Sequence, residues 1–226
     1  MSWTSPEYAN DRRLYGRSPC YPELAAVALA GLVHVLLEFA VTEAVALWFS
    51  AGVALAFLAY LVWRAKSGAV VLRGWGMRVD NFWTALRAQL VLGAAGASAI
   101  LAYAAAEGQI AIPPWSFWLT LALYPIWGVT QQFALQNLIA RNVAGLVRRP
   151  VAVAGVAAVL FAASHVPRWP LVALTFVAGF FFTAIYRRVP NLWAVGLVHG
   201  ILGSLAIYFV SGEDPGAGLW NLVVGL

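Results

Sequence analysis

Charged residues are scarce in this sequence of 226 residues. Asp, Glu, Lys and Arg together make up 10% of the chain, against about 25% in soluble proteins. Apolar residues make up 62%, the mean hydropathy is +0.80, and uncharged stretches of about 18 residues or more recur along the chain. The scarcity of charge excludes soluble enzymes, nucleic-acid-binding proteins and disordered chains, and it predicts a protein embedded in a bilayer.

Cysteine is also scarce, because Cys20 is the only one in the sequence. A single cysteine cannot form an internal disulfide, and it provides no metal cluster. A cleavable signal peptide is not indicated either, since the first apolar run continues without a small-residue cleavage site.

The apolar runs predict an all-α fold, a polytopic transmembrane bundle of about seven spans with a cytoplasmic N-terminus. The stretch Val41–Glu43 is the predicted turn of the first helical hairpin. Prolines lie at most of the predicted ends, and Pro125, inside the fourth span, predicts a kink. The spans are expected at residues 24–41, 44–63, 83–106, 115–140, 150–166, 170–186 and 192–210.

No repeat or low-complexity segment stands out in the sequence, so residues 1–226 are expected to form a single membrane domain. Residues 1–21 are its predicted cytoplasmic N-terminal segment. A polar connector at residues 64–78 contains three glycines that interrupt helices. The tail at residues 216–226 is too short to cross a bilayer and is expected to lie at the interface.

The basic residues agree with an alternating topology, since Lys and Arg concentrate in short cytoplasmic loops. Of the 14 basic residues, only Arg168 falls on the predicted outer side. The formal net charge of +5 is therefore attributed to topology rather than to nucleic-acid binding. The predicted cytoplasmic residues are Arg12, Arg13, Arg17, Arg64, Lys66, Arg73, Arg78, Arg87, Arg141, Arg148, Arg149, Arg187 and Arg188.

Several polar side chains lie inside the predicted spans, where an unpaired polar group is costly. They are His34, Glu38, Gln131, Gln132, Gln136, His165 and His199. Counted at about 1.5 Å per residue, the histidines, Glu38 and Gln131 fall within a slab about 10 Å thick. One polar cavity would hold them. Alternatively, each residue only hydrogen-bonds a neighbouring helix, and the pair of His34 and Glu38 only fixes helix register.

Three segments, Gln131–Gln136, Phe161–His165 and His199–Gly203, resemble a known set of motifs. The set is Glu-Glu-x-x-x-Arg, Phe-x-x-x-His and His-x-x-x-Asn or Asp, and it belongs to the CPBP group. This group comprises CAAX prenyl proteases, bacteriocin-processing proteins and abortive-infection proteins. The gaps of 33 residues from Gln132 to His165 and 34 residues from His165 to His199 are also similar. The resemblance covers about residues 70–205 and includes the connector Gly76–Phe82 with Ala85–Arg87.

The resemblance implies an intramembrane endopeptidase. In the group, paired glutamates activate water, and the histidines with Asn or Asp assist metal binding or stabilise an oxyanion. The matching positions are Phe161, His165 and His199. The differing positions are Gln131 and Gln132 for the glutamates, Gln136 for the arginine and Gly203 for Asn or Asp. A glutamine amide orients a water but cannot take its proton, and general-base catalysis contributes about 10² to 10⁴ in rate.

Three functions follow, and the first is favoured. It is a noncatalytic CPBP-like binding or accessory subunit, a pseudoprotease that uses the inherited cavity to hold a helix, lipid or prenyl-like ligand. The second is an active endopeptidase or hydrolase in which Glu38, oriented by His34, is a relocated base and His165 and His199 bind metal or an oxyanion. The third is a transporter or channel-like protein, which only Pro125 supports. The candidate site residues are His165, His199, Gln131, Gln132 and Glu38.

No cofactor is expected for the favoured function. Zinc enters only with the hydrolase alternative, because two histidines and one carboxylate make a zinc ligand set. The expected partners are membrane lipid and a transmembrane helix or membrane protein complex, and no nucleic acid. The 11 tryptophans supply interfacial anchors, and the predicted location is the inner or plasma membrane of the cell, as a multi-pass integral protein.

Overall fold

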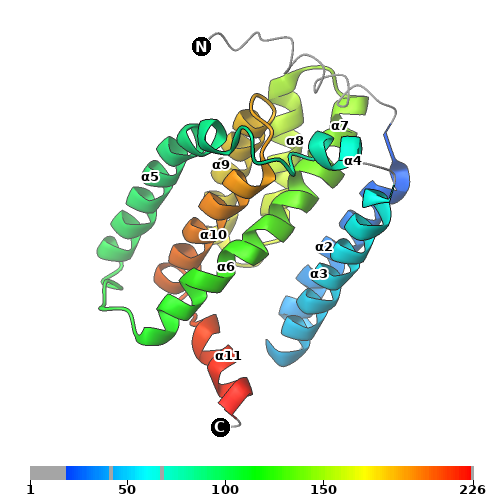
Figure 1. Cartoon of the computed structure of the whole chain (residues 1–226). Helices are drawn as coiled ribbons and strands as arrows, with labels where there is room; N and C mark the ends of the chain where they lie inside the picture. Colours follow the sequence, from blue (N-terminus) through cyan, green and yellow to red (C-terminus); the bar gives the residue numbers. More distant parts are fainter. Residues whose placement is uncertain (1–18, 41–42, 67–68, 225–226) are drawn as a thin grey trace.

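The computed structural model describes residues 19–40, 43–66 and 69–224. Among these residues every regular element is a helix, which confirms the predicted all-α class. Figure 1 shows the long helices packed side by side in one bundle, with α2 (Tyr21–Ala40) and α3 (Glu43–Ala65) paired along one side. Residues 41–42 of the predicted first turn lie outside the described residues.

The bounds of the other long helices follow the predicted spans closely. The uncharged runs set these bounds, because a charged side chain within a span would have to leave water. The helices are α5 (Phe82–Ala106), α8 (Pro150–Ala163), α9 (Trp169–Tyr186) and α10 (Leu192–Phe209). Two short helices lie outside them, α4 (Ala69–Gly74) in the connector and α11 (Pro215–Val224) in the tail.

The fourth predicted span, at residues 115–140, lies in one continuous helix of three parts that extends six residues further than predicted, to Leu146. These are α6 (Trp115–Phe133), the π-helix η2 (Ala134–Ala140) and α7 (Arg141–Leu146). Pro125 lies inside α6, which continues as a helix to Phe133, and the kink at Pro125 stays a prediction. The observed irregularity is the π-helix, and such segments occur frequently at functional sites.

Within the described ranges, four helices are long and apolar enough to cross a membrane. They are the window Trp48–Ala65 of α3, and α5, α9 and α10 over their full lengths. Tyr21–Leu37 and Pro150–Ala163 are shorter apolar helices. The chain is therefore a helical membrane protein, while the count of seven spans and the cytoplasmic N-terminus remain predictions.

Helix α10 lies at the centre of the bundle. Buried residues make up 56% of its apolar window, against none in the window of α3. It crosses α6 at close range, since a Cβ on Gly200 would lie 2.6 Å from the nitrogen of Pro125. A Cβ on Gly128 would lie 2.7 Å from the nitrogen of Gly200. Only glycine permits this crossing, which brings Gln132, one turn beyond Gly128, beside His199.

The connector is fixed to the turn between α9 and α10. Gly76 has the positive φ of 68° that favours glycine, and its carbonyl accepts a hydrogen bond of 2.8 Å from Leu192 N. Asn191 caps α10 and donates a bond of 2.7 Å to the carbonyl of Arg78. The connector, α7 and the turn from α9 to α10 thus share one end of the bundle, called here the α7 end (Figure 1). The described basic segments that were predicted to be cytoplasmic meet there.

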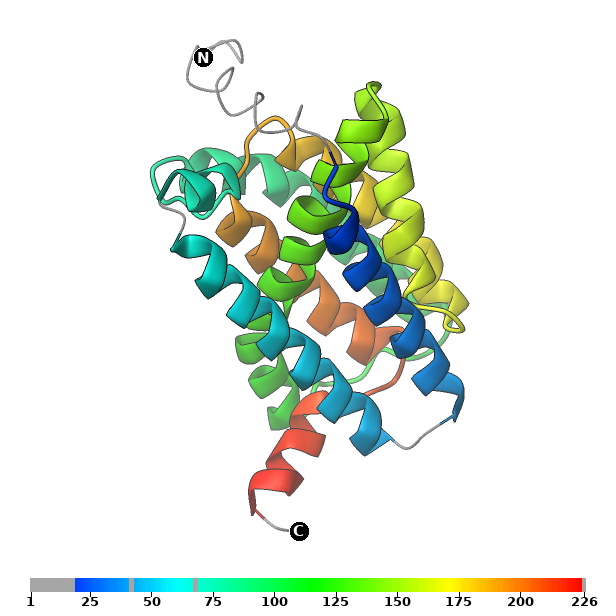
Figure 2. The same ribbon diagram turned by 90° about the vertical axis from the view of Figure 1, so that its right-hand side faces the viewer.

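Helices α2 and α3 cover one face of the bundle. Figure 2 shows both helices in front of α6 and η2, with α8 beside them. None of the residues in the apolar window of α3 is buried, so this pair of helices is peripheral. It forms one wall of the cavity described below.

Candidate functional site

The two neighbouring glutamines of the first motif have different surroundings. Gln132 is fully buried, and its Nε2 lies 2.8 Å from Nδ1 of His199. Gln136, also fully buried, donates from Nε2 to Oε1 of Gln132 over 2.9 Å. Because Oε1 accepts, Gln132 presents its NH₂ group to His199, whose Nδ1 is therefore the acceptor. The three side chains form a neutral hydrogen-bonded chain between α6, η2 and α10.

Two aromatic rings enclose His199. Phe182 stacks on it, with ring centroids 5.6 Å apart and planes 20° apart. Phe161 meets it edge-on at 5.5 Å and also meets His165 edge-on at 5.0 Å. His199 retains only 7% of its exposure. Phe161 therefore contacts both histidine rings, and the two imidazoles lie in separate surroundings.

The position of the motif's Asn or Asp is occupied by Gly203 and a neighbouring ring. A Cβ on Gly203 would lie 2.5 Å from Cε1 and 3.0 Å from Cδ1 of Tyr124. These distances are shorter than a carbon–carbon contact permits. Tyr124 of α6 thus fills the space in which a side chain at position 203 would begin, and the glycine is a packing requirement.

A cavity of about 480 Å³ lies between the pair α2 and α3 on one side and α6, η2 and α8 on the other. Its volume is in the range of about 300 to 1,000 Å³ that is typical of small-molecule sites. The polar side chains among its lining residues are His34, Ser50, Thr130, Gln131, Ser164 and His165. The remaining lining is apolar.

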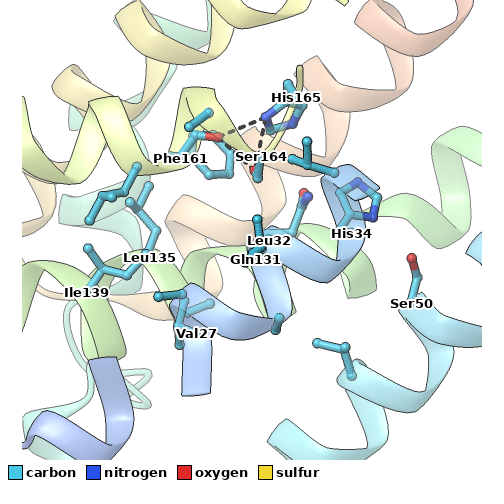
Figure 3. Close-up of a pocket in the computed structure, with 18 of the residues that line it drawn as sticks. Val27, Leu32, His34, Ser50, Gln131, Leu135, Ile139, Phe161, Ser164 and His165 are labelled. Atoms are coloured by element: carbon cyan, nitrogen blue, oxygen red, sulfur yellow. Dashed lines mark hydrogen bonds between the residues drawn. The ribbon is translucent and has the colours of Figure 1, made fainter. Parts of the chain in front are cut away.

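The polar lining residues gather at one part of the cavity. Figure 3 shows Gln131, Ser164 and His34 near one another, with Val27 and Leu135 on the other side. Nδ1 of His165 lies 2.9 Å from the carbonyl oxygen of Phe161 and 3.3 Å from Oγ of Ser164. Since a carbonyl oxygen only accepts, Nδ1 carries the proton and Nε2 is the acceptor of this ring.

The predicted site residues therefore divide into two groups. Gln132, Gln136 and His199 lie in the interior of the bundle. The second group, Gln131, His34 and His165, lines the cavity. Glu38 belongs to α2, but its side chain lies outside the described residues.

The described residues do not fit a zinc site. In the part of the chain that the structure describes, no three His, Cys, Asp or Glu side chains converge as a metal site requires. Nδ1 of His199 is bonded to Gln132, and Phe161 contacts both rings of the proposed ligand pair His165 and His199. We derive no chemical step through a metal.

Sequence analysis missed a buried carboxylate at the α7 end. Glu23 in the first turn of α2 accepts hydrogen bonds from Arg141 at 2.7 Å, from Asn142 at 2.6 Å and from Tyr60. The guanidinium of Arg141 lies 5.7 Å from the ring centre of Trp75. This cluster joins α2 and α3 to α7. The available signal was an acidic residue at the start of an apolar helix.

Two further residues were missed because only packing reveals them. Phe182 has no polar group to mark it, and its stacking on His199 depends on how α9 meets α10. Tyr124 precedes Pro125 in an apolar stretch, and nothing in the sequence relates it to Gly203.

Comparison with known proteins supports the resemblance to the CPBP group. Residues 113–205 match the family model described as "Type II CAAX prenyl endopeptidase Rce1-like". No curated protein and no solved structure matches the chain. The matched segment contains α6, η2, α7, α8, α9 and most of α10, and so all three motifs, whereas α2, α3 and the connector lie outside it. The resemblance to the CPBP group predicted from the motifs is thus confirmed for residues 113–205, the segment in which this membrane protein is similar to Rce1-like type II CAAX prenyl endopeptidases.

Proposed function

We propose that this chain is a noncatalytic CPBP-like protein of the inner or plasma membrane that holds an apolar ligand in the cavity beside α2 and α3. The observation that carries the proposal is the chemistry of the first motif. Gln131 is the motif residue that lines the cavity, and its amide cannot accept a proton from water.

The buried part of the site also has amides where the motif has charged groups. Gln136 donates to Gln132, and Gln132 donates to His199, so both amides hold the helices together. Among the residues described, no Asp or Glu lines the cavity. Without a carboxylate base, the rate of peptide hydrolysis falls by a factor of about 10² to 10⁴.

The arrangement at Gly203 supports the same conclusion. In the motif set, the Asn or Asp at this position stabilises an oxyanion or assists metal binding. In this chain the residue is Gly203, which has no side chain for either role. The ring of Tyr124 occupies the adjoining space. Loss of an oxyanion donor by itself costs about 10² to 10³ in rate.

The cavity itself supports ligand binding. Most of its lining is apolar, contributed by α2, α3, α6, η2 and α8. An apolar chain gains from such a lining about 25 cal/mol for each Å² removed from water, although a chain that enters from lipid gains less. The peripheral pair α2 and α3 forms one wall of the cavity.

A cleavage assay with purified protein tests the proposal. Incubation with a prenylated CAAX peptide in detergent is expected to yield no product, for the unmodified chain and for His199→Ala alike. The His199→Ala variant is expected to lower the melting temperature, because Gln132 loses its partner. Cleavage that disappears in His199→Ala would overturn the proposal.

A hydrolase is the second candidate, favoured by one observation. Nδ1 of His165 is bonded to the Phe161 carbonyl, which leaves Nε2 as an acceptor able to take a proton. Glu38 is the other candidate base. Cleavage that is lost in both His165→Gln and Glu38→Gln would support a relocated base, whereas cleavage indifferent to both changes would exclude it.

A further inference from the structure

The cavity has an apolar part and a polar part. Val27, Leu135 and Ile139 lie at one side, and His34, Ser164 and His165 lie at the other (Figure 3). Apolar side chains predict that a hydrocarbon chain occupies the first part. The polar side chains predict a head group with hydrogen-bonding atoms in the second.

The polar part of the main cavity is formed by amide, hydroxyl and imidazole groups. Among the described residues, no Asp, Glu, Lys or Arg lines the main cavity. A charged head group placed there would lose its hydration without gaining an ionic partner, and that cost is large in an apolar surrounding. For the residues that the structure describes, the absence of a counter-charge favours a neutral head group.

The hydrogen-bonding capacity of the polar part fits a hydroxyl group. Nε2 of His165 is an acceptor, because Nδ1 donates to the carbonyl of Phe161. The amide of Gln131 and the hydroxyl of Ser50 each donate and accept. Ser164 donates to the Phe161 carbonyl over 2.8 Å and retains lone pairs as an acceptor. A ligand hydroxyl both donates and accepts, so it matches this set, whereas a quaternary ammonium or a bare hydrocarbon does not.

A charged alternative exists at the edge of the cavity. A recess of about 30 Å³ shares His34, Ser164 and His165 with the main cavity and is also lined by Arg168. Arg168 pairs with Glu213 at 3.0 Å, so its charge is largely offset where it stands. An anionic head group would have to compete with that carboxylate.

We propose that the cavity binds a long-chain neutral lipid with a hydroxyl head group. The hydroxyl lies among Gln131, Ser164 and His165, and the chain extends toward Val27 and Leu135. This inference rests on the proposed ligand-binding function and adds the chemical class of the ligand. One of its determinants, Val27, belongs to α2, outside the segment that matches the Rce1-like model.

Binding of five probes with one chain length tests the inference. The probes are hexadecanol, hexadecane, hexadecyl phosphate, palmitate and hexadecyltrimethylammonium, each added to the purified full chain in a short-chain detergent. Affinity is measured by native mass spectrometry and by the ligand-induced shift of the melting temperature. Hexadecanol is expected to bind about tenfold more tightly than any of the other probes. One well-placed hydrogen bond supplies a difference of this size in affinity.

Three variants test which residues determine the preference for hexadecanol. Gln131→Leu, at a residue only partly buried, is expected to remove about tenfold of the preference for hexadecanol over hexadecane. Val27→Trp, which fills the apolar part, is expected to weaken all five probes alike. Gln109→Leu, at an exposed residue beyond α5, is the matched control and is expected to leave every affinity unchanged.

Each failure has a distinct meaning. Equal binding of hexadecane and hexadecanol would overturn the hydroxyl class and leave the proposed function standing. Preference for hexadecyl phosphate or palmitate would overturn it in favour of an anion site at Arg168. Failure of every probe to bind the unmodified chain would overturn the inference and the proposed function together.

Discussion

Nε2 of Gln132 lies 2.8 Å from Nδ1 of His199, at two positions where the motif set has a glutamate and a histidine. Both groups are buried, and both are neutral in this arrangement. A glutamate at this position would bring a charge into the apolar interior, where it would need the arginine that Gln136 replaces. The exchange of Glu and Arg for two amides keeps the contact between α6 and α10 without any charge.

Removal of the Gln132 amide is expected to destabilise the fold. Gln132→Leu leaves Nδ1 of His199 and Nε2 of Gln136 without their partner, and each unpaired buried group costs about 1–3 kcal/mol. Thermal unfolding in detergent measures the loss. Gln131→Leu, the neighbouring change on the cavity side, is the control and is expected to have a much smaller effect. Equal losses of thermal stability in the two variants would contradict the assignment of Gln132 to the buried interior and of Gln131 to the cavity.

Restoring the motif's asparagine is expected to be unfavourable. Gly203→Asn places Cβ 2.5 Å from Cε1 and 3.0 Å from Cδ1 of Tyr124, and such overpacking costs about 1–3 kcal/mol. Tyr124→Ala, which removes the ring, is expected to lower stability by itself but to relieve the clash when both changes are combined. A double-mutant cycle on melting temperatures measures this coupling. Additive effects of the two changes would show that the ring does not restrict position 203.

The carboxylate of Glu23 is expected to hold α2 and α3 to the bundle. Glu23→Ala leaves Arg141, Asn142 and Tyr60 without their common acceptor, and breaking a buried ion pair costs about 3–5 kcal/mol. Hydrogen exchange is expected to rise mainly in α2 and α3. The pair of Arg168 and Glu213 is the control, because both side chains are more than a third exposed. Glu213→Ala is expected to cost about 0–1 kcal/mol, and an equal loss in both variants would contradict the role of burial.

The connector is expected to confer a modest dependence of stability on pH. Hydrogen bonds from Arg78, together with the charges of Arg78 and Arg73, hold the pKa of Asp80 below its ordinary value of 3.8, despite partial desolvation. A lowered folded pKa stabilises the fold fully above the unfolded value and loses that contribution as the pH falls through the folded pKa. The melting temperature is therefore expected to fall below about pH 4.

Asp80→Asn tests this dependence. The variant is expected to melt slightly lower than the unmodified chain at about pH 7 and to lose less of its melting temperature on acidification to about pH 3. The side chain of Asp80 is 45% exposed, so solvent screening keeps the effect small. An unchanged acid dependence in the variant would assign it to other carboxylates.

The bounds of the helices could be predicted from the sequence because they depend on local composition. A charged residue or a proline ends an apolar run wherever the helix packs. Thus Phe82–Ala106 and Leu192–Phe209 were expected within one residue. The motif residues were identified in the same way, from types and spacings along the chain.

The division of the site was decided by tertiary structure. Depth along a helix axis follows from residue counting, but the direction of a side chain around that axis depends on which neighbour the helix meets. Gln131 and Gln132 differ by about 100° around α6. The close approach of Gly128 to Gly200 turns Gln132 toward His199 and leaves Gln131 facing the cavity.

The sequence by itself therefore determined the helical membrane class, the positions of the helices and the loss of the acidic motif. Only the packed structure decided that Gln131 lines the cavity whereas Gln132 and Gln136 are buried in the bundle. It also decided that Tyr124 fills the space beside Gly203 and that Glu23 joins α2 and α3 to α7. The physical reason is the separation along the chain over which each effect acts. Desolvation of charge acts residue by residue along the chain, whereas ring packing and buried hydrogen bonds join residues up to 119 positions apart.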